Sequence, residues 1–321
     1  MEQETTDRCA PEVRRRREDH ARRAAPSPGP TPVSAQAPGR TPGEAPNQAP
    51  PPVRGDRVRI ALIDAGIGLL AAAAAVRRLR PHADLVLSSD PDGMPWGPRT
   101  PEDVTSRALG IAEAAAAYRL DALVVACNTA TVLALPALRA RFEPDLPVIG
   151  TVPAVKPAAA GGGPVAVWAT PATTGSAYQR ALIDEFAAGV RVTEVPCPGL
   201  SDAVENADEA AVARAVAAAA ERTPADVRAV VLGCTHYELV AEHILTAVRR
   251  NGPPPALHGT ADAVAAQALR RIGARPAPQA PAVGTVTTLL SGRRAALPPA
   301  ALAYGEGRLL KAPAPAAGLH P

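Results

Sequence analysis

Aromatic residues and long apolar runs are scarce in this chain. Tryptophan, tyrosine and phenylalanine together make up 2% of its 321 residues, although 47% of the residues are hydrophobic. No uncharged apolar run reaches the roughly 18 residues that a membrane-spanning helix requires. The N-terminus is polar and acidic and lacks the apolar region of a secretory signal. We therefore expect a cytoplasmic protein without a membrane partner.

Charge of either sign is not in large excess. The 34 lysines and arginines and the 31 aspartates and glutamates give a formal net charge of +3. Much of the basic surplus lies in one stretch, with a run of four arginines at residues 14–17. A surface that binds nucleic acid usually carries clustered basic charge on the folded domain. The composition therefore argues against a nucleic-acid partner.

Residues 1–56 lack isoleucine, leucine and aromatic residues, but they hold eleven of the 37 prolines. Such a segment buries too little apolar surface to offset the entropy that ordering costs. We predict a disordered Pro/Arg-rich extension over residues 1–56 and a Pro/Ala-rich tail over residues 311–321. The chain from residue 57 onward, about 265 residues, is long enough for a large core or two domains.

Cysteine is also sparse, and its spacing excludes two common uses. The four cysteines are Cys9, Cys127, Cys197 and Cys234, and none belongs to a CxxC pair. This pattern fits neither a disulfide framework nor a zinc site, so we predict no metal. Free thiols in a reducing compartment either fill core space or react.

From residue 57 onward, short apolar runs alternate with alanine-rich amphipathic stretches. The apolar runs predict strands at residues 58–63, 83–88, 122–126, 147–150, 164–168, 191–195 and 229–232. The amphipathic stretches predict helices at residues 69–79, 101–119, 133–142, 176–187, 208–221 and 238–249. This alternation is typical of parallel sheets that helices cover on both faces.

The two halves of this pattern resemble each other. An opening strand ends at Asp64 in the first half and near Thr170 in the second, and a later strand ends at Cys127 and at Cys234. The separations are 63 and 64 residues, which indicates a duplicated α/β unit. Ligands of open α/β sheets bind at the carboxyl ends of strands, so the two thiols are expected in one cleft. The alternative is that both cysteines only fill core space.

Six segments carry a resemblance to a known family. They are Asp64-Ala65-Gly66, Pro95-Trp96-Gly97-Pro98-Arg99, the ACNTAT of residues 126–131, Gly175-Ser176-Ala177-Tyr178, Glu205, and the GCTHY of residues 233–237. With these segments in this order, the chain resembles the glutamate racemases of the aspartate/glutamate racemase superfamily from about residue 58 to about residue 310.

The resemblance implies two pseudo-symmetric three-layer α/β/α domains with mainly parallel sheets and an active site in the cleft between them. The first domain would comprise residues 57–152 plus 257–310, and the second residues 153–256. The implied protein is a homodimer that needs no cofactor. It would interconvert L- and D-glutamate, an acidic amino acid, and supply D-glutamate for peptidoglycan.

The implied chemistry uses two bases, one on each face of the substrate's Cα. By resemblance these are Cys127 and Cys234, of which one removes the proton as a thiolate and the other returns one as a thiol. A thiol with a reference pKa of about 8.5 can supply both forms near neutrality when its surroundings lower that pKa.

The resemblance also assigns supporting residues. Asp64, His236 and Glu205 would assist catalysis. The implied substrate-binding positions are Ala65, Pro95, Trp96, Gly97, Asn128, Thr129, Thr131 and Thr235. From the residues alone, Asp64 could instead cap the following helix, His236 could be a surface imidazole, and Glu205 could be a solvated helix charge.

Two positions depart from the family pattern. Ala65 stands where the family has serine, which removes a hydroxyl expected near the substrate, and Trp96 stands where the family usually has tyrosine. An indole N–H donates a hydrogen bond but cannot accept one. These departures leave open a racemase for aspartate or another amino acid. A catalytically weak paralogue that binds an acidic ligand is a further alternative.

Overall fold

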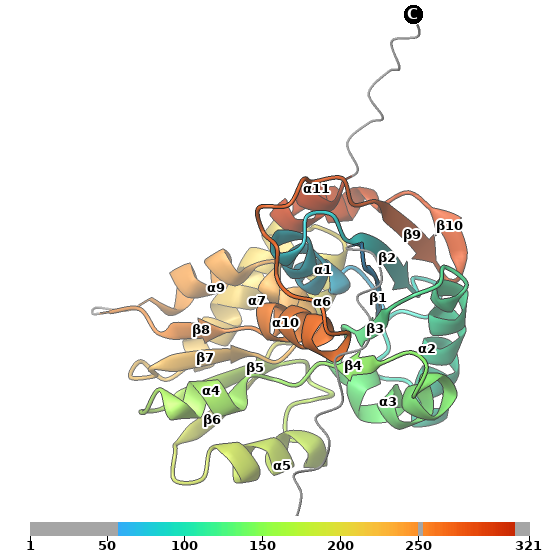
Figure 1. Ribbon diagram of the computed structural model, residues 1–321. Helices are drawn as coiled ribbons and strands as arrows, with labels where there is room; N and C mark the ends of the chain where they lie inside the picture. The colour runs from blue at the N-terminus through green and yellow to red at the C-terminus, as the bar shows by residue number, and fades with distance from the viewer. Residues whose placement is uncertain (1–56, 250–252, 312–321) are drawn as a thin grey trace, which may run out of the picture. The chain divides into compact units, whose positions relative to one another are not determined.

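The computed structural model describes residues 57–249 and 253–311 (Figure 1). The predicted extension over residues 1–56 and the predicted tail beyond residue 311 lie outside the described residues. Of the helices in the described segments, none has both the length and the apolar character that crossing a membrane would require.

Ten strands form two separate sheets in the described residues. The first sheet contains β1 (Arg59–Asp64), β2 (Asp84–Ser89), β3 (Ala122–Val125), β4 (Val148–Gly150), β9 (Val286–Leu290) and β10 (Arg293–Ala295). Its order is β10-β9-β2-β1-β3-β4, and only the β9–β10 pair is antiparallel. The second sheet contains β5 (Val165–Ala169), β6 (Val192–Pro196), β7 (Ala229–Leu232) and β8 (Ala256–His258). Its order is β6-β5-β7-β8, and all pairs are parallel.

The strand order confirms the predicted duplication. Strands β2-β1-β3-β4 of the first sheet follow the same order as β6-β5-β7-β8 of the second. The strands β1 and β5 that open the two halves are each central in their sheet, and β3 and β7 lie beside them. The predicted fold class, an α/β protein with two pseudo-symmetric halves and mainly parallel sheets, is therefore confirmed.

The helices lie in the connections between strands. They are α1 (Leu69–Leu79), α2 (Pro101–Ala116), α3 (Asn128–Phe142), α4 (Val155–Ala160), α5 (Ala177–Phe186), α6 (Leu200–Glu205), α7 (Glu209–Arg222), α8 (Thr235–Glu238), α9 (Ala241–Val248), α10 (Ala261–Arg271) and α11 (Gly305–Leu310), with a 3-10 helix at Pro299–Ala303. Thr100 caps α2 by accepting a hydrogen bond from the backbone N–H of Asp103, and Pro101 suits its first turn.

Alternating side chains of the central strands pack into separate cores on the two faces of each sheet. In β1, Ile60 and Leu62 pack with α1, α10 and α11, whereas Ala61 and Ile63 pack with α2 and α3. The residues of β5 alternate in the same way between a core with α6, α7 and α9 and a core with α4 and α5. Both sheets are thus covered on both faces, as the continuous apolar strands predicted.

Several predicted helix bounds were wrong. The helix predicted at 133–142 begins at Asn128, directly after Cys127, because weak helix formers in its first turn hid the start from the apolar pattern. The helix predicted at 238–249 is α9 and begins only at Ala241, and the short helix α8 before it was not predicted. The short helices α4 and α6 and the β9–β10 hairpin were missed because each is too short to show a period.

We propose the two domains with the bounds predicted from sequence, residues 57–152 plus 257–310 and residues 153–256. This division is supported by the return of the chain to the first sheet, where β9 pairs with β2 and α10 packs on α1. The last strand of the second sheet, β8 (Ala256–His258), spans the proposed boundary.

Leu62→Ala should destabilise the protein strongly. Leu62 lies in the middle of β1 and is fully buried, so the substitution leaves a cavity in the first sheet. We expect a loss of about 2–5 kcal/mol in the free energy of unfolding, measured by urea denaturation. Leu309→Ala makes the same chemical change at a side chain that is 48% exposed, and it should cost much less. Equal losses at the two positions would contradict the assignment of Leu62 to the core.

Candidate active site

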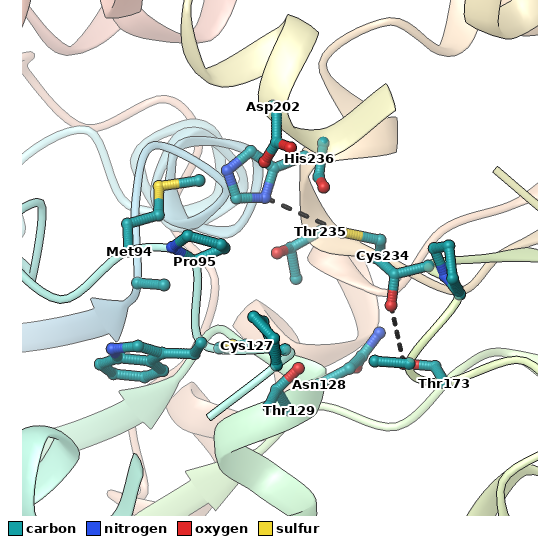
Figure 2. Close-up of a pocket in the computed structure, with 18 of the residues that line it drawn as sticks. Met94, Pro95, Cys127, Asn128, Thr129, Thr173, Asp202, Cys234, Thr235 and His236 are labelled. Carbon is teal, nitrogen blue, oxygen red and sulfur yellow. Dashed lines mark hydrogen bonds between the residues drawn. The ribbon is translucent and has the colours of Figure 1, made fainter. Parts of the chain in front are cut away.

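A cavity of about 390 Å³ lies among loops that follow strands of both sheets. The first sheet contributes the segments after β1, β2 and β3, and the second those after β5, β6 and β7 (Figure 2). The lining residues are Asp64, Ala65, Met94, Pro95, Trp96, Gly97, Pro98, Cys127, Asn128, Thr129, Thr170, Pro171, Ala172, Thr173, Pro198, Gly199, Ser201, Asp202, Gly233, Cys234, Thr235 and His236. The carboxyl ends of the strands therefore build this site, as expected for parallel sheets.

Cys127 and Cys234 occupy equivalent places in the two halves. Each is the N-cap residue of the helix that follows its strand, with φ/ψ of −145°/123° at Cys127 and −141°/137° at Cys234. Both line the cavity. Burial raises the pKa of the Cys127 thiol well above its ordinary value, and the charges of Asp64 and Cys234 raise it further. The two predicted thiols therefore meet at one site.

Asp64 is buried at the end of β1 and bonds across to the second half of the molecule. Its Oδ2 accepts the hydroxyl of Thr235 at 3.1 Å, and its Oδ1 accepts the backbone N–H of Ala65 at 2.6 Å. It also has a side-chain hydrogen bond with Cys127. Burial raises the pKa of Asp64 to about 6, although the nearby His236 opposes this shift. The residue does not cap α1, whose N-cap is Gly68 without a side-chain bond.

His236 joins Cys234 to Glu205. Its Nδ1 lies 3.8 Å from Cys234 Sγ, and its Nε2 lies 2.9 Å from Glu205 Oε2. Burial alone lowers the pKa of His236, but hydrogen bonds with Cys234 and Glu205 and the charge of Asp64 raise it well above its ordinary value. His236 is 4% exposed, so it is not a surface imidazole.

Glu205 ties the loop after β1 to this histidine. Besides His236, its Oε2 accepts the backbone N–H of Ile67 at 2.8 Å. A Cβ on Gly66 would come within 2.2 Å of the same oxygen, and a Cβ on Gly68 within 2.5 Å of Asp64 Oδ2. Only glycine leaves room for these carboxylates, because real Cβ contacts are longer than this.

Asn128 makes a third link between the halves. Its Nδ2 donates to the backbone carbonyl oxygen of Gly233 at 2.8 Å. Asn128 directly follows Cys127 and Gly233 directly precedes Cys234. The bond therefore connects the backbone beside one thiol to the side chain beside the other.

Most of the predicted site residues line the cavity, but two do not. Thr131 is buried, and its hydroxyl accepts the backbone N–H of Thr151 at 3.0 Å. Glu205 lies behind His236 and outside the lining residues. Thr173, which follows β5, lines the cavity, whereas Ser176 caps α5 by accepting the N–H of Gln179. Cys197 is buried outside the lining, and burial raises its pKa to about 12.

Several lining residues were not predicted from the sequence. Met94 and Pro98 flank the predicted Pro95-Trp96-Gly97 segment, and Asp202 adds an exposed carboxylate from α6. The remainder, Thr170, Pro171, Ala172, Pro198, Gly199, Ser201 and Gly233, follow β5, β6 and β7. The rule that ligands bind beyond strand ends could have found them, because all lie within six residues of a predicted strand end.

A model of the Asp/Glu/Hydantoin racemase family matches residues 68–275. The chain belongs to this family. Among individual racemases, the chain is 38% identical over 221 residues to the glutamate racemase of Pseudomonas putida strain W619, which covers 67% of this chain and 82% of that protein. It is 40% identical over 193 residues to the glutamate racemase of Roseiflexus sp. strain RS-1, covering 58% of this chain and 70% of that protein.

Solved racemase structures share the fold. The Escherichia coli glutamate racemase in complex with L-glutamate and the activator UDP-MurNAc-ala aligns with a TM-score of 0.65 and 28% identity, over 77% of this chain and 92% of that one. The glutamate racemase from Thermus thermophilus in complex with beta-chloro-D-alanine aligns with a TM-score of 0.58 and 27% identity, over 81% and 95%. The sequence-based assignment to the racemases is therefore confirmed.

Asp64→Asn should change how stability depends on pH. Because the folded state raises the pKa of Asp64 to about 6, the folded protein binds the proton more tightly than the unfolded chain. The wild type therefore loses stability as the pH rises through about 4 to 6, and the variant escapes this loss. Its free energy of unfolding relative to the wild type should rise by up to about 3 kcal/mol between pH 4 and pH 7, measured by urea denaturation.

Asp92→Asn is the matched control for this experiment. Asp92 is exposed, and its hydrogen bond with Arg293 lowers the pKa of the carboxyl. Because this carboxyl titrates at or below about pH 4 in both the folded and the unfolded state, the relative stability of the variant should stay nearly constant between pH 4 and pH 7. A rise at Asp92 equal to that at Asp64, or no rise at Asp64, would contradict the assignment of a buried, strained charge to Asp64.

Proposed function

We propose that this protein interconverts L- and D-glutamate by moving a proton between Cα and the thiols of Cys127 and Cys234. The observation that carries the proposal is the placement of both cysteines at equivalent strand ends, lining one cavity. A substrate Cα held between them would have one thiol on each face. Removal on one face and return on the other inverts the configuration.

His236 lies beside Cys234 in the cavity. Its imidazole has a raised pKa, and Nδ1 lies 3.8 Å from Cys234 Sγ. A protonated imidazole at this place can donate a hydrogen bond to the sulfur. The other ring nitrogen, Nε2, lies 2.9 Å from Glu205 Oε2. This contact orients the imidazole so that Nδ1 faces the sulfur.

The Cys127 side is suited to hold a thiol. Burial and the negative charge of Asp64 raise the pKa of Cys127, so this sulfur keeps its proton near neutrality. In one direction of the proposed reaction Cys127 is therefore the group that returns a proton, and Cys234 is the group that removes one. In the opposite direction Cys127 must give up its proton first. That proton passes to Cys234, so the two sulfurs together hold one proton in either direction and their roles as acid and base are exchanged.

Neutral donors would hold the substrate carboxylates. Thr129 and Thr235 line the cavity with hydroxyl groups, and the N-terminus of α3 begins beside them at Asn128. Helix N-termini and hydroxyls donate to anions. We propose substrate contacts at these residues and at Ala65, Pro95, Trp96 and Gly97, which share the lining. For Thr131, whose hydroxyl bonds Thr151, a substrate-binding role stays a prediction from the sequence.

Glutamate is the substrate that the related proteins favour. The Escherichia coli glutamate racemase was solved in complex with L-glutamate, and the related racemases named above are glutamate racemases. The alternatives of another amino acid and of a weak, ligand-binding paralogue gain no support from these relatives. A supply of D-glutamate to peptidoglycan, a homodimer and a cytoplasmic location stay predictions.

Cys127→Ser and Cys234→Ser should each suppress racemisation by about 100-fold or more, because each removes one of the two acid–base groups. Purified protein is incubated with L-glutamate in deuterium oxide. Deuterium at Cα is followed by proton NMR and D-glutamate by chiral chromatography. Wild type should produce both signals.

Cys197→Ala provides the matched control, because Cys197 is a buried thiol outside the cavity lining. It should retain most of the activity. Full activity of either serine variant would exclude the two-thiol mechanism. Wild type that leaves glutamate and other acidic amino acids unchanged would exclude the racemase.

Ala65→Ser tests the departure from the family pattern at this position. Ala65 lines the cavity and is 6% exposed, so a serine hydroxyl there would face the substrate site. One added hydrogen bond to a charged group should lower the KM for glutamate by about tenfold. Steady-state kinetics with glutamate and aspartate measures it. A raised KM for glutamate would show that the site has adapted to alanine.

A further inference from the structure

The Trp96 side chain is held by groups behind the cavity wall. Trp96 lines the cavity and is 2% exposed. Its indole Nε1–H donates to Asp90 Oδ2 at 3.0 Å, and Asp90 is not among the lining residues. An indole has one polar atom. With that atom bonded to Asp90 and the ring packed in a core cluster of the first sheet, the Trp96 side chain leaves no unbonded polar atom to face the cavity.

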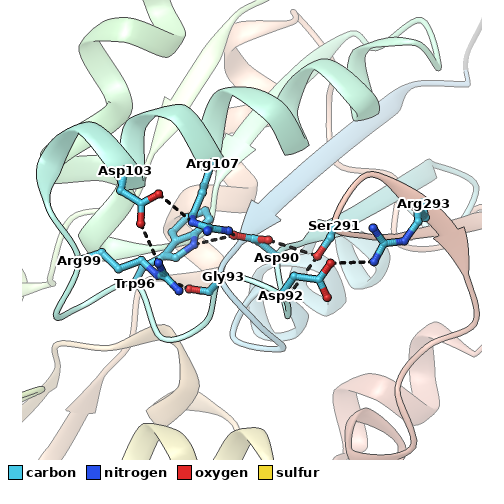
Figure 3. A network of polar contacts seen from close by, with 9 residues as sticks. All are labelled: Asp90, Asp92, Gly93, Trp96, Arg99, Asp103, Arg107, Ser291 and Arg293. Carbon is cyan, nitrogen blue, oxygen red and sulfur yellow. Dashed lines mark hydrogen bonds and ion pairs between the residues drawn. The ribbon is translucent and has the colours of Figure 1, made fainter.

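Asp90 is the centre of a polar network behind this wall (Figure 3). Its Oδ2 also accepts from Arg107 at 3.2 Å, and its Oδ1 accepts the hydroxyl of Ser291 at 3.2 Å. Arg107 bonds Asp103 at 3.0 Å, and Asp103 bonds Arg99 at 2.7 Å. Asp90 itself is 4% exposed. Burial removes the water that would otherwise solvate the carboxylate, so the protein donors must replace it. These hydrogen bonds hold the Asp90 side chain in one position.

The same network encloses the loop that carries the wall. The backbone N–H of Asp90 donates to the carbonyl of Ala65 at 3.1 Å, and that of Gly93 donates to the carbonyl of Asp90 at 3.0 Å. Arg99 bonds the carbonyl of Gly93 from the far end of the loop. A Cβ on Gly93 would come within 2.0 Å of Asp90 Oδ2. The loop is therefore folded tightly around the Asp90 carboxylate.

We propose that Asp90 is a positioning residue that sets the Trp96 ring in the substrate-binding wall, and that it does so through the indole N–H. The part of this inference that concerns substrate rests on the proposed racemase function. The Trp96 side chain has no free polar atom that could take part in proton transfer, so a displaced ring weakens binding by changing the shape of the wall and leaves proton transfer between the thiols largely intact. Loss of Asp90 therefore acts on KM rather than on kcat.

The test is a double-mutant cycle of Asp90→Ala and Trp96→Phe. Asp90→Ala should raise the KM for glutamate by about tenfold and change kcat by less than about threefold, since it removes a hydrogen bond to a charged group. In the Trp96→Phe background, which has no indole N–H, the same change should raise KM by less than about threefold. Asp90→Asn keeps an oxygen acceptor and should restore KM to near the wild-type value.

Arg293→Ala is the matched control. It removes the exposed ion pair of Arg293 with Asp92 at the edge of the same network, but it leaves the Trp96–Asp90 bond in place. Its KM should stay within about twofold of wild type.

A second readout needs no substrate and so separates this proposal from the racemase function. The chain has two tryptophans, Trp96 and Trp168. Asp90→Ala should shift the emission maximum to longer wavelength and increase acrylamide quenching, because the freed Trp96 ring meets water. In the Trp96→Phe background only Trp168 emits, and Asp90→Ala should leave its spectrum unchanged.

Two results would overturn the proposal. One is a KM increase for Asp90→Ala that is the same with and without the indole. The other is tryptophan emission that Asp90→Ala leaves unchanged while Trp96 is present. A wild type without racemase activity would refute the proposed function, and the fluorescence experiment would still decide whether Asp90 positions Trp96.

Discussion

The hydrogen bond from the Thr235 hydroxyl to the buried Asp64 carboxylate joins the two halves of the molecule at the cavity that we propose as the active site. A buried carboxylate is costly unless donors surround it. Asp64 obtains one donor from its own half, at Ala65, and one from the other half, at Thr235. The Asp64 carboxylate therefore has both hydrogen bonds only when the two halves are packed together. The site thus depends on the packing of the two halves.

The features that repeat in the sequence were the predictable ones. Matching separations from Asp64 to Cys127 and from Thr170 to Cys234 predicted a duplicated unit, and the equal strand orders confirm it. Strand ends marked the site because parallel sheets collect their ligands there. These predictions needed only period, spacing and chemical type, and they located both thiols, Asp64 and His236.

Contacts between segments distant in sequence were beyond prediction. Nothing in the local sequence of Glu205 indicates that it bonds Ile67 and His236, residues from different halves. Trp96 was predicted as a substrate-binding position, but nothing in the sequence indicates that its indole N–H bonds Asp90. In each case the hydrogen-bond partner is a residue that only the folded chain brings close.

The near-repeat of the two halves contrasts with their unlike partners for sulfur, a carboxylate at Cys127 and an imidazole at Cys234. Mirror-image amino acids have equal free energies in water, so their equilibrium favours neither. For a catalyst of such an exchange, kcat/KM must then be the same for both enantiomers. The chemical difference between the halves can only divide that common value differently into kcat and KM. A site with different groups on its two sides can therefore give each enantiomer its own kcat and KM, although it leaves the equilibrium between them unchanged.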